Sequence, residues 1–160
     1  MERTNFMIRR VQLKDIDEIM VIERQSFPVA WEYTIFLNIC LRGGEIASGE
    51  TGILFMDILE RDERVLGYVV WEVDSKTSSG HILNLAVQQA ERRRGHGRKL
   101  LFHVIDDLKV REVTCCRLEV RESNIPARML YEASGFVASS KIVGYYFDED
   151  AIVYTMALRS

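Results

Sequence analysis

Residues 85–101, LAVQQAERRRGHGRKLL, join the end of an apolar strand to an arginine-rich turn and a strongly amphipathic helix. Two glycines lie at alternate positions where the helix begins. Glycine allows the backbone to approach a ligand closely, and the N-terminus of a helix offers unpaired N–H groups and positive potential. The sequence therefore predicts a binding site for phosphate or pyrophosphate at this turn.

Three familiar phosphate or nucleic-acid sites do not fit this segment. A Walker A loop is absent, and a Rossmann fingerprint would need a third glycine where Leu100 stands. The basic cluster is short and has no interleaved aromatic residues, which disfavours a nucleic-acid patch. A charged helix start with glycines that only form a tight turn stays open as an alternative.

Composition limits the classes of protein that remain. Hydrophobic residues make up 48% of the 160 residues and charged residues 28%, as in a soluble globular domain. The formal net charge is -3, which gives no support to general nucleic-acid binding. We expect a single domain over residues 1–160, with a core that needs no metal or disulfide.

The cysteines and the N-terminal residues bear on the compartment. The three cysteines are Cys40, Cys115 and Cys116, and no CxxC motif occurs. This pattern predicts reduced thiols in a cytoplasmic protein, with neither a disulfide framework nor a metal site. Residues 1–15 lack the apolar core of a signal peptide, and no apolar run approaches the about 20 residues of a membrane span, so we expect no membrane association.

The order of apolar patterns predicts a mixed α/β domain with an early antiparallel hairpin and a later crossover. Residues 43–52 contain four glycines and predict a mobile loop. A stripe of leucine, valine and isoleucine between Leu100 and Leu108 makes residues 95–112 the clearest helix. Strands are expected at 6–13, 53–60, 65–74, 81–87, 114–120, 136–142 and 152–158, and helices at 14–25, 31–42, 95–112 and 124–134.

Several motifs together resemble one known family. Arg92-x-x-Gly95-x-Gly97 matches the Q/R-x-x-G-x-G/A signature of the GNAT acetyltransferases. Residues 118–136 nearly complete their SNxxAxxLYExxGF pattern, and residues 22–31, IERQSFPVAW, resemble the front segment of RimI-type and related N-terminal acetyltransferases. Gly144-Tyr145-Tyr146 is similar to their late paired tyrosines. The resemblance spans residues 6–158, with departures at residues 88–90 (QQA) and at Pro126.

The resemblance implies a GNAT fold, in which one mixed, mostly antiparallel sheet of about seven strands is flanked by about four helices. It implies that acetyl-CoA binds and that acetyl passes directly to the N-terminal α-amine of proteins or peptides, ribosomal or nascent chains included, without an acyl-enzyme. An auxiliary subunit or a homodimer fits the family as well. Two alternatives stay open: transfer to lysine side chains, polyamines or other small amines, and a module that binds acetyl-CoA or a partner without turnover.

The resemblance also implies site residues. Glu119 is the candidate base, His81 is a second candidate base, and Tyr131 is the expected general acid for the thiolate. The residues expected at the cofactor are Leu85, Ala86, Val87, Arg92, Arg93, Arg94, Gly95, His96, Gly97, Arg98, Asn124 and Tyr131. Those expected at the peptide are Phe27, Pro28, Trp31, Glu119, Tyr145 and Tyr146.

Plain structural roles compete with some of these assignments. Glu119 is within reach of Arg117 or Arg121 on one strand face for an ion pair. Large aromatic residues such as Phe27, Trp31 and Tyr131 are often part of a core. The acidic residues 148–150 suit a cationic amine, and the adjacent Cys115 and Cys116 are expected to pack in the interior.

Overall fold

The computed structural model describes residues 5–158 and has one eight-stranded sheet. The expectation about a signal peptide includes residues 1–4, and the expectation of one domain over residues 1–160 includes residues 1–4 and 159–160. These terminal residues lie outside the described ones. The strands are β1 (Phe6–Arg10), β2 (Glu45–Ser48), β3 (Gly52–Arg61), β4 (Arg64–Asp74), β5 (Ser79–Val87), β6 (Cys115–Arg121), β7 (Val137–Tyr146) and β8 (Glu149–Ala157). The helices are α1 (Ile16–Ser26), α2 (Tyr33–Leu41), α3 (His96–Val110) and α4 (Ile125–Ala133), with short 3-10 turns at Leu13–Asp15 and Gln89–Glu91.

The sheet follows the order β1-β3-β4-β5-β6-β8-β7, with β2 paired to β3. Among residues 5–158, only β5 and β6 run parallel, so the predicted mixed and mostly antiparallel sheet is confirmed. The mobile loop predicted at residues 43–52 is wrong, because β2 lies within it. Gly43, Gly44 and Gly49 adopt positive φ at the turns before and after β2, so these glycines make tight turns.

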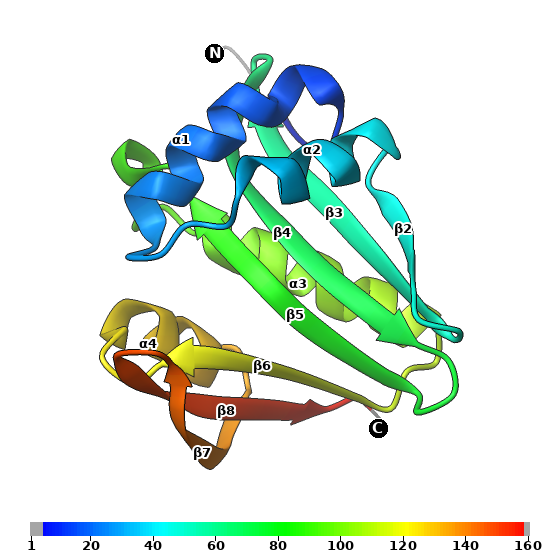
Figure 1. Ribbon diagram of the computed structural model, residues 1–160, viewed down its shortest axis with the longest axis vertical. Helices are drawn as coiled ribbons and strands as arrows, with labels where there is room; N and C mark the ends of the chain where they lie inside the picture. Colours follow the sequence, from blue (N-terminus) through cyan, green and yellow to red (C-terminus); the bar gives the residue numbers. More distant parts are fainter. Residues whose placement is uncertain (1–4, 159–160) are drawn as a thin grey trace.

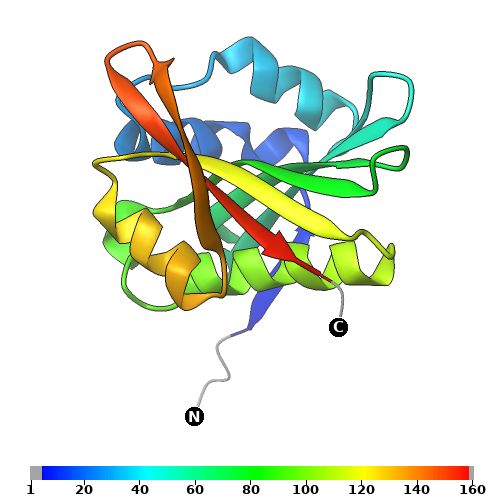
Figure 2. The ribbon, with the colours of Figure 1, turned by 90° about the horizontal axis from the view of Figure 1, so that it is seen from below.

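Helices cover both faces of the sheet (Figures 1 and 2). The apolar faces of α1 and α2 pack on β3 and β4 around Phe36, Met56 and Tyr68. On the other face, the predicted stripe of α3 packs against Trp71 and Leu118, and Leu100 and Leu108 are both 0% exposed. No helix among residues 5–158 is long and apolar enough to cross a membrane.

The sheet opens between β5 and β6. These strands pair over only four positions, from Ser79↔Cys115 to Ile82↔Leu118, whereas the β4–β5 ladder continues to Val87. Beyond Ile82 the two strands diverge, and α4 lies beside the far part of β6 (Figure 1). One edge of β5 therefore has no strand partner from residue 83 to residue 87.

Several expected elements have different bounds, and two of these differences have identifiable reasons. The first strand ends at Arg10 because Gln12 N–H donates to Asp15 Oδ2 (2.8 Å), which starts the 3-10 turn. The strand expected at residues 136–142 extends to Tyr146 in β7, whose residues are nearly all exposed. An edge strand with little burial lacks the alternation from which its end would be recognised.

Candidate active site

Two adjoining cavities occupy the opening between β5 and β6. The first, of about 490 Å³, lies between residues 85–87 of β5, the turn at 91–98 and the start of α4. The second, of about 390 Å³, lies between residues 82–85 of β5, residues 118–121 of β6 and the segment joining α1 to α2. Both cavities are lined by Ser26, Phe27, Leu85, Asn124 and Ala127, so they form one continuous channel.

The arginine-rich turn brings backbone N–H groups to the first cavity. Arg93 (φ 64°) and Gly95 (φ 82°) both adopt the left-handed region, which folds the chain back into the start of α3. Gly95 caps this helix without a side-chain hydrogen bond, and His96, Gly97 and Arg98 follow as its first residues. All three residues line the first cavity, and the described structure shows no side-chain cap at this helix start, which suits an anion site.

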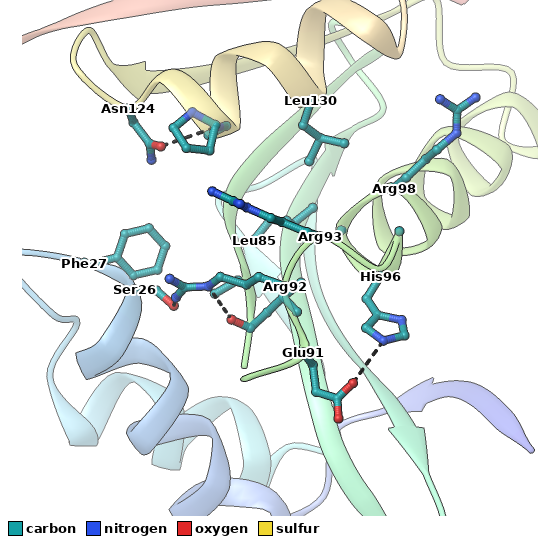
Figure 3. A pocket seen from close by; sticks show the side chains of 16 residues that line it. Ser26, Phe27, Leu85, Glu91, Arg92, Arg93, His96, Arg98, Asn124 and Leu130 are labelled. Carbon is teal, nitrogen blue, oxygen red and sulfur yellow. Dashed lines mark hydrogen bonds and ion pairs between the residues drawn. The ribbon is translucent and has the colours of Figure 1, made fainter. Parts of the chain in front are cut away.

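The four arginines of the turn have different roles, and Figure 3 shows three of them, Arg92, Arg93 and Arg98. Arg92 donates from Nε to the Val87 carbonyl (3.1 Å) and from NH2 to Ser26 Oγ (2.9 Å), which ties the turn to β5 and α1. The side chain of Arg93 extends between Arg92 and Leu130 into the cavity. Arg94 pairs with Glu91 (3.3 Å) and lines neither cavity, whereas Arg98 lines the first.

His96 and Asn124 contribute in different ways. The His96 ring is 3% exposed and lies beneath the turn, 3.5 Å from Glu91 Oε2. Burial lowers the pKa of this imidazole, so a neutral ring supports the turn from below while the backbone of His96 faces the cavity. Asn124 Oδ1 accepts from Ala127 N–H (3.3 Å) and caps α4, and Asn124 borders both cavities.

The second cavity has an aromatic rim. Phe27, Pro28 and Trp31 line it from the α1–α2 segment, and Tyr146 lines it from the end of β7. Trp31 also stacks on Phe36 (5.5 Å between ring centroids), so it belongs to the core and to the cavity wall together. Tyr145 is not a lining residue; it is half exposed and meets Tyr146 edge to face.

A buried carboxylate fixes this rim. Glu23 is 0% exposed and accepts from Trp31 N–H (2.9 Å), from Asn84 Nδ2 (2.9 Å) and from the Tyr68 hydroxyl. The contacts join the α1–α2 segment to β4 and β5. Sequence reasoning missed Glu23 and Asn84. Glu23 lies three residues after Met20 and four after Ile19, on the apolar face of the helix, where an acid is unusual, but Asn84 gives no local signal.

The two candidate bases lie against each other where β5 and β6 separate. His81 Nε2 and Glu119 Oε2 are 2.5 Å apart, and Glu119 lines the second cavity while His81 does not. Burial alone would raise the pKa of the Glu119 carboxyl, but the hydrogen bond and charge of His81, with the charge of Arg117, hold it below its usual value.

Of the two expected ion pairs for Glu119, one is present. Arg117 Nε is 3.8 Å from Glu119 Oε1, whereas Arg121 is held by Asp148 (2.9 Å) and Glu149 (3.4 Å). Of the acidic residues 148–150, which are expected to suit a cationic amine, Asp148 also lines the second cavity, and this expectation stays a prediction. Asp150 is also engaged, since it accepts from Gly144 N–H (2.8 Å).

Tyr131 and the cysteines complete the predicted set. Tyr131 is 7% exposed, packs against Phe136 and Tyr154, and borders the second cavity. Tyr131 is therefore part of both the hydrophobic core and the cavity wall. Burial raises the pKa of its hydroxyl. Cys116 is buried as expected, but the expectation for Cys115 is wrong because alternate residues of β6 face opposite sides and Cys115 is exposed.

Such a channel, with an anion-binding turn at one end and a carboxylate–imidazole pair at the other, defines a group-transfer enzyme with a phosphate-bearing donor. The family model described as acetyltransferase (GNAT) family matches residues 16–136. The chain is 30% identical to the [ribosomal protein bS18]-alanine N-acetyltransferase of Salmonella typhimurium, over 89% of this chain and 99% of that protein. It is 32% identical to an N-alpha-acetyltransferase of Saccharolobus solfataricus, over 96% of this chain and 92% of that protein.

A solved structure agrees with these relatives. The crystal structure of the ribosomal-protein-S18-alanine N-acetyltransferase from Escherichia coli matches with a TM-score of 0.80 and 28% identity, covering 98% of this chain and 96% of that chain. The chain belongs to the GNAT acetyltransferase family. The expected fold, and the expectation of an acetyl-CoA-dependent N-acetyltransferase rather than a module without turnover, are confirmed.

Proposed function

We propose that this acetyltransferase transfers acetyl to the free N-terminal α-amine of proteins or peptides by direct attack in a ternary complex. The main observation is the channel of two adjoining cavities, with the arginine-rich turn at one end and Glu119, which His81 contacts, on the wall of the other. The relatives described above are named for the same reaction, one as an alanine N-acetyltransferase and one as an N-alpha-acetyltransferase.

The residues of the first cavity fit acetyl-CoA. The unpaired edge of β5 at Leu85, Ala86 and Val87 suits the amides of an extended arm, which it would bind as an added strand. The first N–H groups of α3, with Arg93 and Arg98, suit a pyrophosphate. The thioester supplies an already activated acetyl group, so no enzyme nucleophile is needed.

The second cavity would hold the peptide terminus against the base pair. An α-amine has a pKa of about 8, so roughly one-tenth is neutral at pH 7, against about one in a few thousand for a lysine side chain. As the neutral amine becomes an amide, its nitrogen loses one proton. The Glu119–His81 pair would accept that proton, directly or through one water. Phe27, Pro28 and Trp31 present apolar surface, which suits the first side chain of a peptide.

Tyr131 would act as the general acid. Burial raises the pKa of its hydroxyl, so this group keeps its proton at neutral pH. It would donate that proton to the departing thiolate, whose pKa is about 8.5 for a free thiol.

Initial rates with acetyl-CoA test the acceptor class. The peptides begin with Ser, Ala, Met-Leu and Met-Glu, and an N-terminally blocked peptide with one lysine is the control. We expect turnover on the free termini only, and mass spectrometry should place the acetyl group on the α-nitrogen. Turnover on the blocked peptide alone would move the acceptor to lysine and contradict the proposal.

Compartment and partners are further proposals. The free thiols of Cys40, Cys115 and Cys116 support a cytoplasmic enzyme, because disulfides are rare there. Substrates among ribosomal or nascent chains are supported by the name of the Salmonella relative. An auxiliary subunit or a homodimer is tested by light scattering of the purified chain, with and without a cell extract from its source.

A further inference from the structure

A row of polar side chains crosses the sheet beside the base pair. Glu72 of β4 stands opposite His81 of β5, and His81 stands beside Arg117 of β6 in the parallel ladder. Glu119 follows two residues later on the same face of β6. These three strands lie side by side (Figure 1), and Ser48 of β2 extends the row by donating to Glu72 Oε2 (2.9 Å).

The two nitrogens of His81 have different environments. Nε2 faces Glu119 Oε2 at 2.5 Å. Nδ1 faces two groups of opposite charge, since Arg117 NH2 lies at 3.3 Å and Glu72 Oε1 at 3.6 Å. A guanidinium can only donate, so the Arg117 contact requires an unprotonated Nδ1. A carboxylate accepts, so the Glu72 contact favours a proton on the same atom.

The burial of these groups divides them into an inner pair and an outer pair. The side chains of His81 and Glu119 are 14% and 12% exposed, while those of Glu72 and Arg117 are 31% and 49% exposed. Nδ1 therefore lies on the side of the outer, more exposed pair, and Glu119 of the inner pair lines the second cavity. Tyr145 and Tyr146 of β7 also face Glu119, and burial raises the pKa of both hydroxyls, so they add no charge at neutral pH.

We propose that Glu72 and Arg117 are positioning residues that act in opposite senses on Nδ1 of His81, and that their balance sets the pH above which the Glu119–His81 pair accepts the amine proton. This inference rests on the proposed role of that pair. With Nδ1 unprotonated, His81 is neutral and donates from Nε2 to the Glu119 carboxylate. With Nδ1 protonated, the imidazolium lies between two carboxylates, its own basic nitrogen is used up, and its charge makes Glu119 a weaker base.

The proton is conserved in this exchange. The Nδ1–H bond breaks with its electron pair left on nitrogen, and an O–H bond forms on Glu72 Oε1. Water then takes that proton from the exposed Glu72 carboxylate. His81 is left neutral, with its remaining proton on Nε2 and with Nδ1 free to accept from Arg117.

The test compares Glu72→Gln with Arg117→Met. The first variant keeps the shape of the side chain but removes the anion, so the acid limb of the kcat/KM profile should move down by about 0.5–1 pH unit. The second removes the cation, so the same limb should move up by a similar amount. Glu72→Asp should restore most of the wild-type limb. Asp106→Asn, an exposed single-charge change in α3 on the other face of the sheet, is the matched control and should move it by less than about 0.2 unit.

Two features of the test distinguish a failure of this inference from a wrong assignment of the acceptor amine. Rates are measured with whichever amine the wild-type enzyme acetylates, so the titration of the acceptor is common to all variants. The His81 ring is also followed by NMR against pH without substrate, where the midpoint should move in the same opposite senses. The inference would be overturned if Glu72→Gln and Arg117→Met moved the acid limb or the NMR midpoint in the same direction. It would also be overturned if neither variant moved them further than Asp106→Asn does.

Discussion

Gly97→Ala adds a methyl group to the second residue of α3, on the wall of the first cavity. A Cβ there would lie 3.3 Å from Leu130 Cδ2 and 3.8 Å from Leu85 Cδ2 and Val87 Cγ2. Only the flexible end of Leu130 has to shift, and the backbone of Gly97 is helical. Alanine at a compatible glycine position stabilises by about 0.4–1 kcal/mol. For a chain of this size, we expect the melting temperature to rise by about 1–3 °C.

Binding of the acetyl donor should change in the opposite sense. The added methyl group occupies part of the space between α3, β5 and α4 where the donor would lie. A loss of about 1.4 kcal/mol corresponds to a tenfold weaker affinity. We therefore expect KM for acetyl-CoA to rise about tenfold, with kcat at saturating donor changed by less than about twofold. Thermal melts without ligand, and initial rates against acetyl-CoA at saturating peptide, measure the two effects separately.

Gly95→Ala is the matched control. A Cβ at Gly95 would meet nothing within 4 Å, but φ is +82°, so the only penalty is backbone strain. Left-handed backbone costs an L-residue about 1–2 kcal/mol, so this variant should melt at a lower temperature. If Gly97→Ala left KM unchanged, or lowered the melting temperature as the control does, the assigned place of the donor would be refuted.

Three further changes have distinct expected outcomes. Tyr131→Phe should lower kcat by about 10²-fold with little change in melting temperature, and a wild-type kcat would contradict the general-acid role. Asn124→Ala removes the α4 cap and should cost about 1 kcal/mol in urea unfolding, whereas Asn124→Asp should restore most of it. Burial alone would raise the pKa of Asp57, but His103 and Arg10 hold it below its usual value. The stability from Asp57 is therefore present above about pH 4 and lost as the pH falls further, and Asp57→Asn should remove that dependence in urea titrations at pH 3–6.

The strong periodic patterns predicted most of the fold. The α3 stripe and the β3–β4 hairpin were recognisable because burial on one side imposes a repeat on the sequence. β2 was missed because its four residues lie among glycines, where local composition favours a turn. Its pairing with β3 is a short hairpin, from Ser48↔Gly52 to Glu45↔Phe55, and its four residues are too few to show a clear strand pattern.

The candidate site shows the same division between local and distant information. The phosphate-binding turn is contiguous, so its shape follows from Gly95, Gly97 and the helix behind them. The contact between His81 and Glu119 joins residues 38 apart, and it follows from the short parallel ladder of β5 and β6. Arg92 and Arg94 looked equivalent in sequence, yet the first braces the turn against Ser26 and the second pairs with Glu91.

The short ladder between β5 and β6 has a mechanical consequence. In the described part of the chain, four residue pairs of the sheet join the C-terminal strands to the rest, although α3 packs against both parts. A molecule lying along the open edge of β5 and against α4 would contact both parts and hold them together. Saturation with donor should therefore slow amide hydrogen exchange in β6 and β8, well beyond the atoms that touch it, and make the two halves unfold as one unit.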